Sequence, residues 1–353
     1  MSLLERLKAE IAQDGPISVA AYMTRCLHDP LDGYYATRPA LGERGDFITA
    51  PLVSQMFGEL LGLWAAEMWA AMGSPPRVRL VELGPGDGTM MSDMLRAAKA
   101  APGFLAAAEV WLVDQSDPLR AAQARTLKEH DIRWAARLEE LPADLPLIIL
   151  GNEFLDCLPV NQFVNTAGGW RERRVGLSED GALVFGLSRG LALPVEGNHP
   201  LGAVCAKSAA LADAALAISR LIAAAPCAAL LIDYGAADDR FGDTLQALRG
   251  HAKEDPLAHP GEADLTVRVD FGAFMETAAD AGAQAQLTTQ ADFLRALGIE
   301  ARAAALAARN PDRASLVARQ LERLIDDEQM GQLFKVCCLH APGLSPPGFE
   351  AEA

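Results

Sequence analysis

From residue 77 onward, short apolar runs alternate with segments of helical periodicity. Four such runs are too short for helices in this setting: Val78–Leu83, Val110–Asp114, Ile132–Ala135 and Leu147–Leu150. Ala228–Asp233 supplies a fifth strand, and Gln284–Thr289 and Leu333–His340 are candidates for the last two. Helical segments at Thr89–Ala101 and Pro118–Glu129 separate the first three. Apolar strands that alternate with helices predict a parallel sheet covered on both faces. The pattern therefore predicts an α/β fold with a seven-stranded, mostly parallel, Rossmann-like core.

The rest of the chain is expected to form an N-terminal segment, three insertions and a tail. Residues 1–77 are predicted to be helical, with helices near Leu3–Gln13, Ser18–Leu27 and Val53–Met72. The core should span 78–340, with insertions at 160–205, 236–270 and 291–328. The first of these predicts a small antiparallel sheet, the second is polar and loop-rich, and the third is helical. The proline-bearing tail, 341–353, is expected to be flexible.

Charge narrows the classes of partner. The chain of 353 residues has a formal net charge of -16. Binding to nucleic acid or to anionic lipid needs clustered Lys and Arg, so neither partner is expected. The charge is compatible with a basic polypeptide or a small molecule as substrate, although many acidic proteins are acidic only for solubility.

Cysteine, histidine and apolar patterns bear on compartment and metal binding. The six cysteines form no C-x-x-C pair, and the six histidines show no metal-ligand spacing. Residues 1–15 lack the apolar core of a signal peptide, and the most apolar stretch, 221–232, is too short to span a bilayer. We therefore expect a reduced cytoplasmic protein with no metal and no membrane insertion.

A glycine-rich turn follows the first predicted core strand. It reads Glu82-Leu83-Gly84-Pro85-Gly86-Asp87-Gly88-Thr89, at a point of an open α/β sheet where ligands bind. A dinucleotide fingerprint requires a third glycine at position 89, where this chain has Thr. The spacing G-x-G-x-G, with an acid before it, resembles motif I of class I methyltransferases, whose ligand is cationic. Glu82, Gly84, Pro85, Gly86 and Gly88 are therefore expected to bind S-adenosylmethionine. The alternative is a turn that serves only tight packing of strand and helix.

Other predicted cofactor ligands follow neighbouring strands. Asp114 ends the second strand, where a carboxylate can accept hydrogen bonds from ribose hydroxyls, and Gln115 follows it. Asp114 could instead cap the helix that begins near Pro118. Glu139 follows the third strand near the expected adenine position, and Asn152 ends the fourth. Thr49 closes a polar loop, 45–49, that could fold over the cofactor, or it could cap the next helix.

Several longer motifs make nearly the whole chain, from about Ile17 to His340, resemble the MidA-type methyltransferases. They are Asp29-Pro30 with Gly33-Tyr34-Tyr35, Gly45-Asp46-Phe47-Ile48-Thr49-Ala50-Pro51, Phe57-Gly58-Glu59, the glycine-rich turn, Asn152-Glu153-Phe154-Leu155-Asp156, Ile232-Asp233-Tyr234-Gly235, Asp264-Leu265-Thr266 and Val269-Asp270-Phe271. Mitochondrial members of that family are complex I assembly factors that methylate an arginine. The resemblance implies a class I fold and a protein substrate, a respiratory complex I subunit. Two positions depart from the family pattern: Arg268 replaces a usual His, and Asp114 replaces a more common Glu.

Methyl transfer to a guanidinium requires alignment and carboxylates that bind the acceptor. Glu153 and Asp156 follow the fourth strand, three residues apart, so one helical turn would place both on one side. We expect Glu153 to bind the guanidinium and Asp156 to support it, although Asp156 could simply brace the loop before Pro159.

The expected contacts with the substrate are less specific. They are Asp46, Asp233, Tyr234 and His251, and a structural hydrogen bond is equally compatible with Tyr234. Two other functions stay open: methylation of a small molecule or of another residue type, and an assembly factor whose cofactor pocket is only structural.

Overall fold

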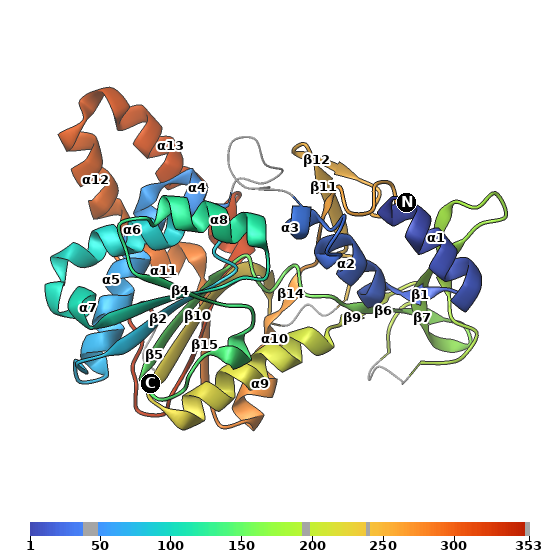
Figure 1. Ribbon diagram of the computed structural model, residues 1–353, viewed down its shortest axis with the longest axis horizontal. Helices are drawn as coiled ribbons and strands as arrows, with labels where there is room; N and C mark the ends of the chain where they lie inside the picture. The colour runs from blue at the N-terminus through green and yellow to red at the C-terminus, as the bar shows by residue number, and fades with distance from the viewer. Residues whose placement is uncertain (38–48, 193–197, 238–240, 350–353) are drawn as a thin grey trace.

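The computed structural model describes residues 1–37, 49–192, 198–237 and 241–349. Its central sheet has the strand order β15-β16-β10-β5-β2-β3-β4 (Figure 1). These strands are β2 (Val78–Leu83), β3 (Ala108–Val113), β4 (Ile132–Ala135), β5 (Leu147–Asn152), β10 (Cys227–Ala236), β15 (Gln284–Thr289) and β16 (Phe334–His340). Neighbours from β10 to β4 are parallel, whereas β16 is antiparallel to both β10 and β15. The predicted seven-stranded, mostly parallel core is confirmed, and β14 (Val269–Asp270) adds a short eighth strand beside β10.

Helices cover both faces of this sheet (Figure 1). Alternate residues of β2 enter different clusters: Val78 and Leu80 pack with the helices of one face, and Val81 and Leu83 with those of the other. The first face carries α5 (Gln55–Ala71), α6 (Thr89–Ala97), η1 (Ala98–Ala100), α7 (Pro102–Ala107) and α11 (Gln290–Ala296); the second carries α9 (Ala209–Ala224) and α10 (Phe271–Asp280). The connections after β3 and β4 contain α8 (Asp117–Thr126) and η2 (Leu138–Glu140).

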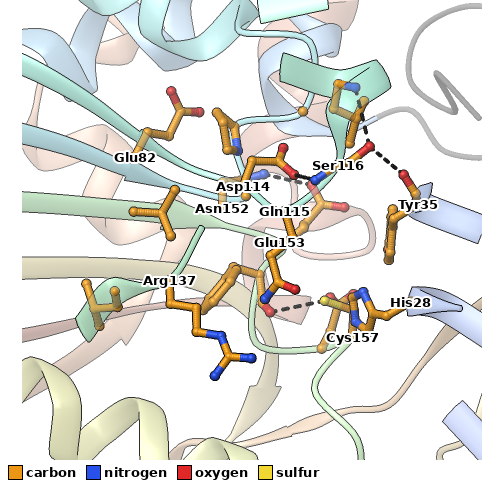
Figure 2. Close-up of a pocket in the computed structure, with 18 of the residues that line it drawn as sticks. His28, Tyr35, Glu82, Asp114, Gln115, Ser116, Arg137, Asn152, Glu153 and Cys157 are labelled. Atoms are coloured by element: carbon orange, nitrogen blue, oxygen red, sulfur yellow. Dashed lines mark hydrogen bonds between the residues drawn. The ribbon is translucent and has the colours of Figure 1, made fainter. Parts of the chain in front are cut away.

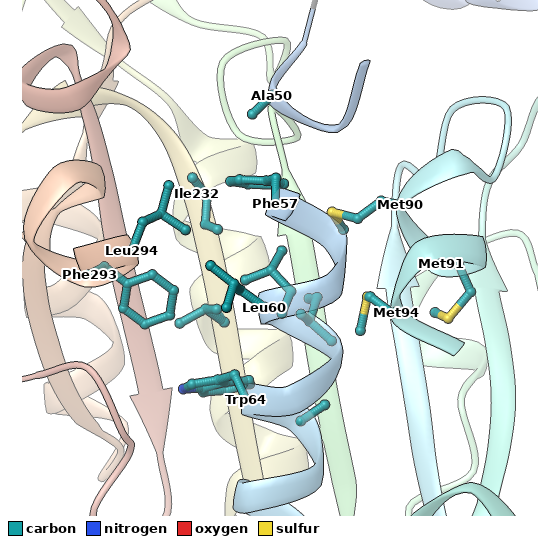
Figure 3. Packing of buried hydrophobic residues seen from close by; sticks show 14 of the residues in the cluster. Ala50, Phe57, Leu60, Trp64, Met90, Met91, Met94, Ile232, Phe293 and Leu294 are labelled. Carbon is teal, nitrogen blue, oxygen red and sulfur yellow. The ribbon is translucent and has the colours of Figure 1, made fainter. Parts of the chain in front are cut away.

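Helix α5 is the centre of the larger cluster. Figure 3 shows Trp64 and Leu60 on the side of Phe293 and Leu294, with methionines of α6 on the other side. Two glycines allow α6 to approach closely: a Cβ on Gly62 would lie 2.5 Å from the Met94 carbonyl oxygen, and one on Gly58 2.7 Å from Asp93 Cβ. The two helices are therefore closely packed against each other at these two positions.

The N-terminal helices pack on the first insertion rather than on the central sheet (Figure 1). Strand β1 (Ile17–Ser18) joins β6 (Asn161–Thr166), β7 (Gly169–Leu177), β8 (Leu183–Leu187) and β9 (Val204–Lys207) in a five-stranded sheet. The helices α1 (Leu3–Asp14) and α2 (Val19–His28) share a hydrophobic cluster with it. Ser18 caps α2 by accepting a hydrogen bond from Ala21 N. This arrangement brings the end of α2 and α3 (Tyr34–Thr37) toward the central sheet.

The second insertion contains more regular structure than the expected loops. Strands β11 (Gln246–Arg249), β12 (Ala252–Glu254) and β13 (Asp264–Thr266) form a three-stranded antiparallel sheet. Its hairpin turns at Gly250 and His251, whose φ values are 58° and 63°. The strands are only three or four residues long and partly polar, so their sequence lacks the apolar alternation that would reveal them.

The third insertion is helical and is anchored to the core by charge. It holds most of α11, then α12 (Ile299–Arg309), η3 (Pro311–Arg313) and α13 (Ala314–Ile325), and α14 (Met330–Leu333) follows it. In the N-terminal segment, α4 (Ala50–Val53) precedes α5. Buried Glu59 accepts hydrogen bonds from Arg302 at 2.8 and 3.0 Å and from Arg96 at 3.0 Å. None of the described helices is long and apolar enough to cross a membrane.

The start of the tail is packed against the core. Trp64 Nε1 donates to the Pro347 carbonyl oxygen at 3.1 Å, and the rings of Phe293 and Phe349 lie 5.6 Å apart. The expectation of a flexible tail is therefore wrong for residues 341–349, because Leu344 and Phe349 pack against the hydrophobic cluster of α5 and α11.

Candidate functional site

A cavity of about 590 Å³ lies at the carboxyl ends of β2, β3 and β5. Figure 2 shows Glu82, Asp114, Asn152 and Glu153 around this space, with His28 and Tyr35 on the opposite side. Ser116 Oγ donates to the Tyr35 carbonyl oxygen at 2.6 Å and so ties α3 to the loop after β3. The cavity is thus enclosed jointly by the central sheet and the N-terminal segment.

The glycine-rich turn forms one wall. Gly84, Gly86 and Gly88 have φ values of 59°, 55° and 86°, in the left-handed region that favours glycine. Gly84 N donates to the Val113 carbonyl oxygen at 3.1 Å, which joins the turn to the end of β3. Gly88 is the N-cap of α6 and, unlike Gly84 and Gly86, is not in the lining.

Two buried polar atoms in the cavity wall lack a partner within the described part of the chain. They are Glu82 Oε2 and Asn152 Oδ1. Burial raises the pKa of Glu82 well above its usual value, and the nearby Asp87 and Asp114 raise it further. A buried acceptor without a donor is costly, so these two atoms favour a ligand that brings positive charge or N–H donors.

Asp114 is held by two hydrogen bonds. Its Oδ1 accepts from Ser116 N at 2.8 Å and its Oδ2 from Gln123 Nε2 at 2.8 Å. Burial raises its pKa, and both bonds oppose that shift by favouring the ionised form. A carboxylate has about four acceptor positions, so Asp114 can still accept from a ligand.

Glu153 has an unusual backbone. Its φ is 51°, a left-handed conformation that non-glycine residues seldom adopt. Glu153 N donates to the Ile232 carbonyl oxygen at 2.8 Å, which fixes this residue against β10. Its Oε1 accepts from Asn152 Nδ2 at 2.9 Å and from Ala50 N at 3.4 Å. Burial raises the pKa of Glu153 to about 7.

Three more carboxyl groups surround Glu153. Asp156 is 4 % exposed, and Asp264 of β13 accepts a hydrogen bond from Tyr35 Oη at 2.8 Å; both line the cavity. Asp233 lies behind them. Burial raises the pKa of Asp156 well above its usual value, and Asp233, Asp264 and Glu153 raise it further. Nowhere in the described ranges do three or more His, Cys, Asp or Glu residues form a group suited to a metal ion. Carboxyl groups gathered in this way can attract an organic cation.

The described lining of the cavity is strongly acidic. It contains eight carboxyl groups (Glu82, Asp87, Asp114, Glu139, Glu153, Asp156, Asp213 and Asp264) and one guanidinium, that of Arg137. A pyrophosphate would meet repulsion here, whereas a sulfonium or a guanidinium would be attracted. The charge of the cavity thus agrees with the spacing of the glycine turn.

Known proteins match this architecture. Residues 60–289 match a family described as "Putative S-adenosyl-L-methionine-dependent methyltransferase". The chain belongs to this family. It is 34% identical to the protein arginine methyltransferase NDUFAF7, mitochondrial, of Danio rerio, over 95% of this chain and 86% of that protein. The human protein of the same name is also 34% identical, over 96% and 83%.

A solved structure extends the match to three dimensions. The crystal structure of a likely methyltransferase from Burkholderia thailandensis, bound to S-adenosyl-homocysteine, matches this structure with a TM-score of 0.84 at 30% sequence identity. The alignment covers 97% of this chain and 92% of that chain. The predictions of a class I methyltransferase fold, of methyltransferase activity and of S-adenosylmethionine as cofactor are confirmed.

The relatives also correct one expectation. Their names place them in mitochondria, so the prediction of a cytoplasmic protein is wrong. It rested on the absence of a recognisable signal peptide, and such an absence does not specify a compartment.

The site residues fit the cofactor of the family. Glu82 and Asn152 offer unpartnered acceptors for the N–H groups of an ammonium, the acidic lining attracts a sulfonium, and Asp114 offers acceptor positions for hydroxyl groups. Gly84, Pro85, Gly86, Gln115, Glu139 and Thr49 also line the cavity, at the positions expected for cofactor contacts. Thr49 makes no side-chain cap to α4, while Ser54 caps α5 by accepting from Met56 N at 3.3 Å.

Several expected substrate contacts lie elsewhere. Asp233 is fully buried, and its carboxylate accepts from Leu155 N and Asp156 N at 2.9 and 3.1 Å, so it braces the loop after β5. Tyr234 Oη donates to Thr266 Oγ1 at 2.7 Å. His251 is exposed at the β11–β12 turn. None of the three is in the described lining, and Asp46 lies outside the described residues.

Sequence reasoning missed part of the lining. His28, Tyr34 and Tyr35 reach the cavity because β1 pairs with β7 and carries the N-terminal helices with it. One face of α9 contributes Ala210, Asp213 and Ala214. The sequence analysis identified Asp264 only as part of a family motif and assigned it no function. Its apolar neighbours in the sequence could have indicated a buried carboxyl.

Proposed function

We propose that the chain methylates an arginine side chain of a protein substrate, a subunit of respiratory complex I. The observation that carries the proposal is the group of carboxyls at Glu153, Asp156 and Asp264, which lines the same cavity as the cofactor residues. The names of the relatives support arginine as the acceptor, and the family resemblance of the sequence supports complex I as the partner.

Glu153 is the residue proposed to hold the guanidinium. Its Oε1 is occupied by Asn152 and Ala50, whereas its Oε2 has no hydrogen-bond partner within the ranges that the structure describes. A guanidinium presents N–H donors in a planar fork that matches carboxylates. Asp156 and Asp264 would offer further oxygen acceptors for its N–H groups, and Asp233 would keep Asp156 in place through its bonds to the backbone of the loop.

The chain must also dispose of a proton. When bound, S-adenosylmethionine supplies a methyl group on a sulfonium, and transfer to a guanidinium yields a thioether, a methylguanidinium and one free proton. A carboxyl with a pKa near 7 can accept that proton at neutral pH and release it again. Glu153 Oε2 would thus both orient the acceptor nitrogen and receive its proton.

Mass spectrometry after incubation with isotope-labelled S-adenosylmethionine tests the proposal. The substrates are isolated complex I subunits, and the label should appear on arginine. Glu153→Gln should lower the rate by at least about 100-fold, because it removes a charged contact to the acceptor and the proton acceptor together. Glu67→Gln is the matched control, since Glu67 is exposed on α5 and does not line the cavity.

Binding of S-adenosyl-homocysteine, measured by calorimetry, should stay within about threefold of wild type in both variants. A label on another residue type would refute arginine as the acceptor. An unchanged rate in Glu153→Gln would refute the role of Glu153. Tight cofactor binding with no label on any subunit would favour a binding protein that uses its pocket structurally.

A further inference from the structure

Gln123 is a fully buried side chain on the inner face of α8, and it is not in the cavity lining. Its amide group makes three hydrogen bonds. Nε2 donates to the Gly86 carbonyl oxygen at 2.9 Å and to Asp114 Oδ2 at 2.8 Å, and Oε1 accepts from Trp134 Nε1 at 2.8 Å. Both amide hydrogens are therefore used, and the indole donor fixes which end of the amide faces which neighbour.

The two acceptors of Nε2 belong to two different parts of the cavity wall. Gly86 is in the glycine turn after β2, and Asp114 follows β3. Within the described ranges, no hydrogen bond joins Gly86 directly to Asp114. One amide group thus sets the position of the carboxylate relative to the turn.

We propose that Gln123 is a positioning residue for the cofactor, which directs the acceptor positions of Asp114 toward the ribose hydroxyls. The bond from Gln123 occupies one acceptor position of Oδ2, and the bond from Ser116 N occupies one of Oδ1. Each oxygen then retains an acceptor position, and the carboxylate cannot rotate without losing both bonds. Arg120 Nε donates to the Asp114 carbonyl oxygen at 2.8 Å, so the backbone is held as well.

A second buried glutamine offers a matched comparison. Gln290 of α11 is also fully buried, and its Nε2 donates to the Leu324 carbonyl oxygen at 2.8 Å. It does not line the cavity. Substitution of either glutamine disturbs a buried amide, but only substitution of Gln123 should change how the ribose is recognised.

The experiment compares the dissociation constants of S-adenosyl-homocysteine and of its 2′-deoxy and 3′-deoxy analogues by calorimetry. We expect wild type to lose about tenfold in affinity when the hydroxyl that Asp114 binds is removed. In Gln123→Met, S-adenosyl-homocysteine should bind about tenfold more weakly, and the loss on removing the same hydroxyl should fall below about threefold. Gln123→Glu keeps the acceptor for Trp134 but removes both amide donors, so it should behave like Gln123→Met.

Gln290→Met should retain the tenfold preference for the hydroxyl. Trp134→Phe is a milder change that removes only the donor orienting the amide, and it should reduce the preference in the same direction. If Gln123→Met does not fold, Trp134→Phe and Gln123→Glu give the same comparison. A preference unchanged from wild type in these folded variants, with all ligands weakened equally, would overturn the proposal and leave Gln123 a packing residue. The measurement needs no methyl acceptor, so its outcome is independent of the proposed arginine substrate.

Discussion

Replacement of Glu153 by Gln should make the protein more stable at neutral and alkaline pH. Gln keeps an oxygen that can accept from Asn152 Nδ2 and Ala50 N, so the two existing hydrogen bonds survive. The substitution removes the free-energy cost of ionising this carboxyl in the folded protein. That cost arises because burial raises the pKa of Glu153 from 4.5 to about 7. The unfolded chain loses this proton near pH 4.5, whereas the folded chain retains it until about pH 7.

The size and direction of the effect follow from that difference in pKa. A difference of about 2.5 pKa units corresponds to about 3 kcal/mol. The cost is absent below pH 4.5, grows as the pH rises toward 7 and is complete above it. In a chain of this length, 3 kcal/mol corresponds to about 4 °C in melting temperature. The variant should therefore match wild type at pH 4 and exceed it by about this amount at pH 8.

Urea unfolding at pH values from 4 to 8.5, followed by circular dichroism, measures the difference directly. Glu67→Gln, which removes an exposed carboxyl outside the cavity, is the control. The reasoning would be refuted if Glu153→Gln were less stable than wild type at pH 8, or if the difference in unfolding free energy did not depend on pH. Either result would mean that ionisation of Glu153 does not destabilise the folded protein. Such a result would also weaken its proposed role, because the raised pKa is what suits it to accept a proton.

Three further measurements test the catalytic carboxyl, the glycine turn and the anchoring of α12. The kcat/KM of wild type should rise through about pH 7 as Glu153 ionises, and rapid-quench assays of Glu153→Gln should show no such rise. Gly86→Val should weaken binding of S-adenosyl-homocysteine at least tenfold in calorimetry while the far-ultraviolet dichroism is retained, because φ is 55° at this position and a β-branched residue avoids that conformation. Glu59→Gln should lower the free energy of unfolding in urea by about 2 kcal/mol, because it leaves Arg96 and Arg302 without their shared carboxylate; an unchanged value would mean that α12 is held by packing alone.

The inner strands of the central sheet could be predicted because they are buried on both faces, as every residue of β2 is. Val78–Leu83, Ile132–Ala135 and Gln284–Thr289 have the same limits in the sequence pattern and in the structure. The five-stranded sheet of the first insertion was only partly predictable. Its outer strand, β1, has two residues and pairs with β7 more than 150 positions away, and nothing local specifies that pairing.

Residues that bind the ligand could be predicted from the sequence because the carboxyl ends of parallel strands meet at one edge of the sheet. This geometry placed Glu82, Asp114, Asn152 and Glu153 at one cavity. The same reasoning failed for Asp233 and Tyr234 because β10 continues to Ala236 and pairs with β14 at Gly235 and Ala236. The apolar run stops at Asp233 but the strand does not, so the acid lies inside the sheet and bonds to the backbone of residues 155 and 156.

Side chains that act through other residues leave no pattern in a single sequence. Gln123 occupies a position in α8 that is polar by composition and fully buried in the structure, and only three contacts from separate segments explain it. The left-handed backbone of Glu153 is equally hidden, since it occurs at a non-glycine residue whose N–H bonds to Ile232 of a strand distant in the sequence. A buried polar group must be hydrogen-bonded, so each such residue implies a partner that the fold brings from elsewhere in the chain. The arrangement around Asp114 and Glu153 therefore depends on tertiary contacts, whereas the glycine turn and the strand ends that carry these acids are encoded locally.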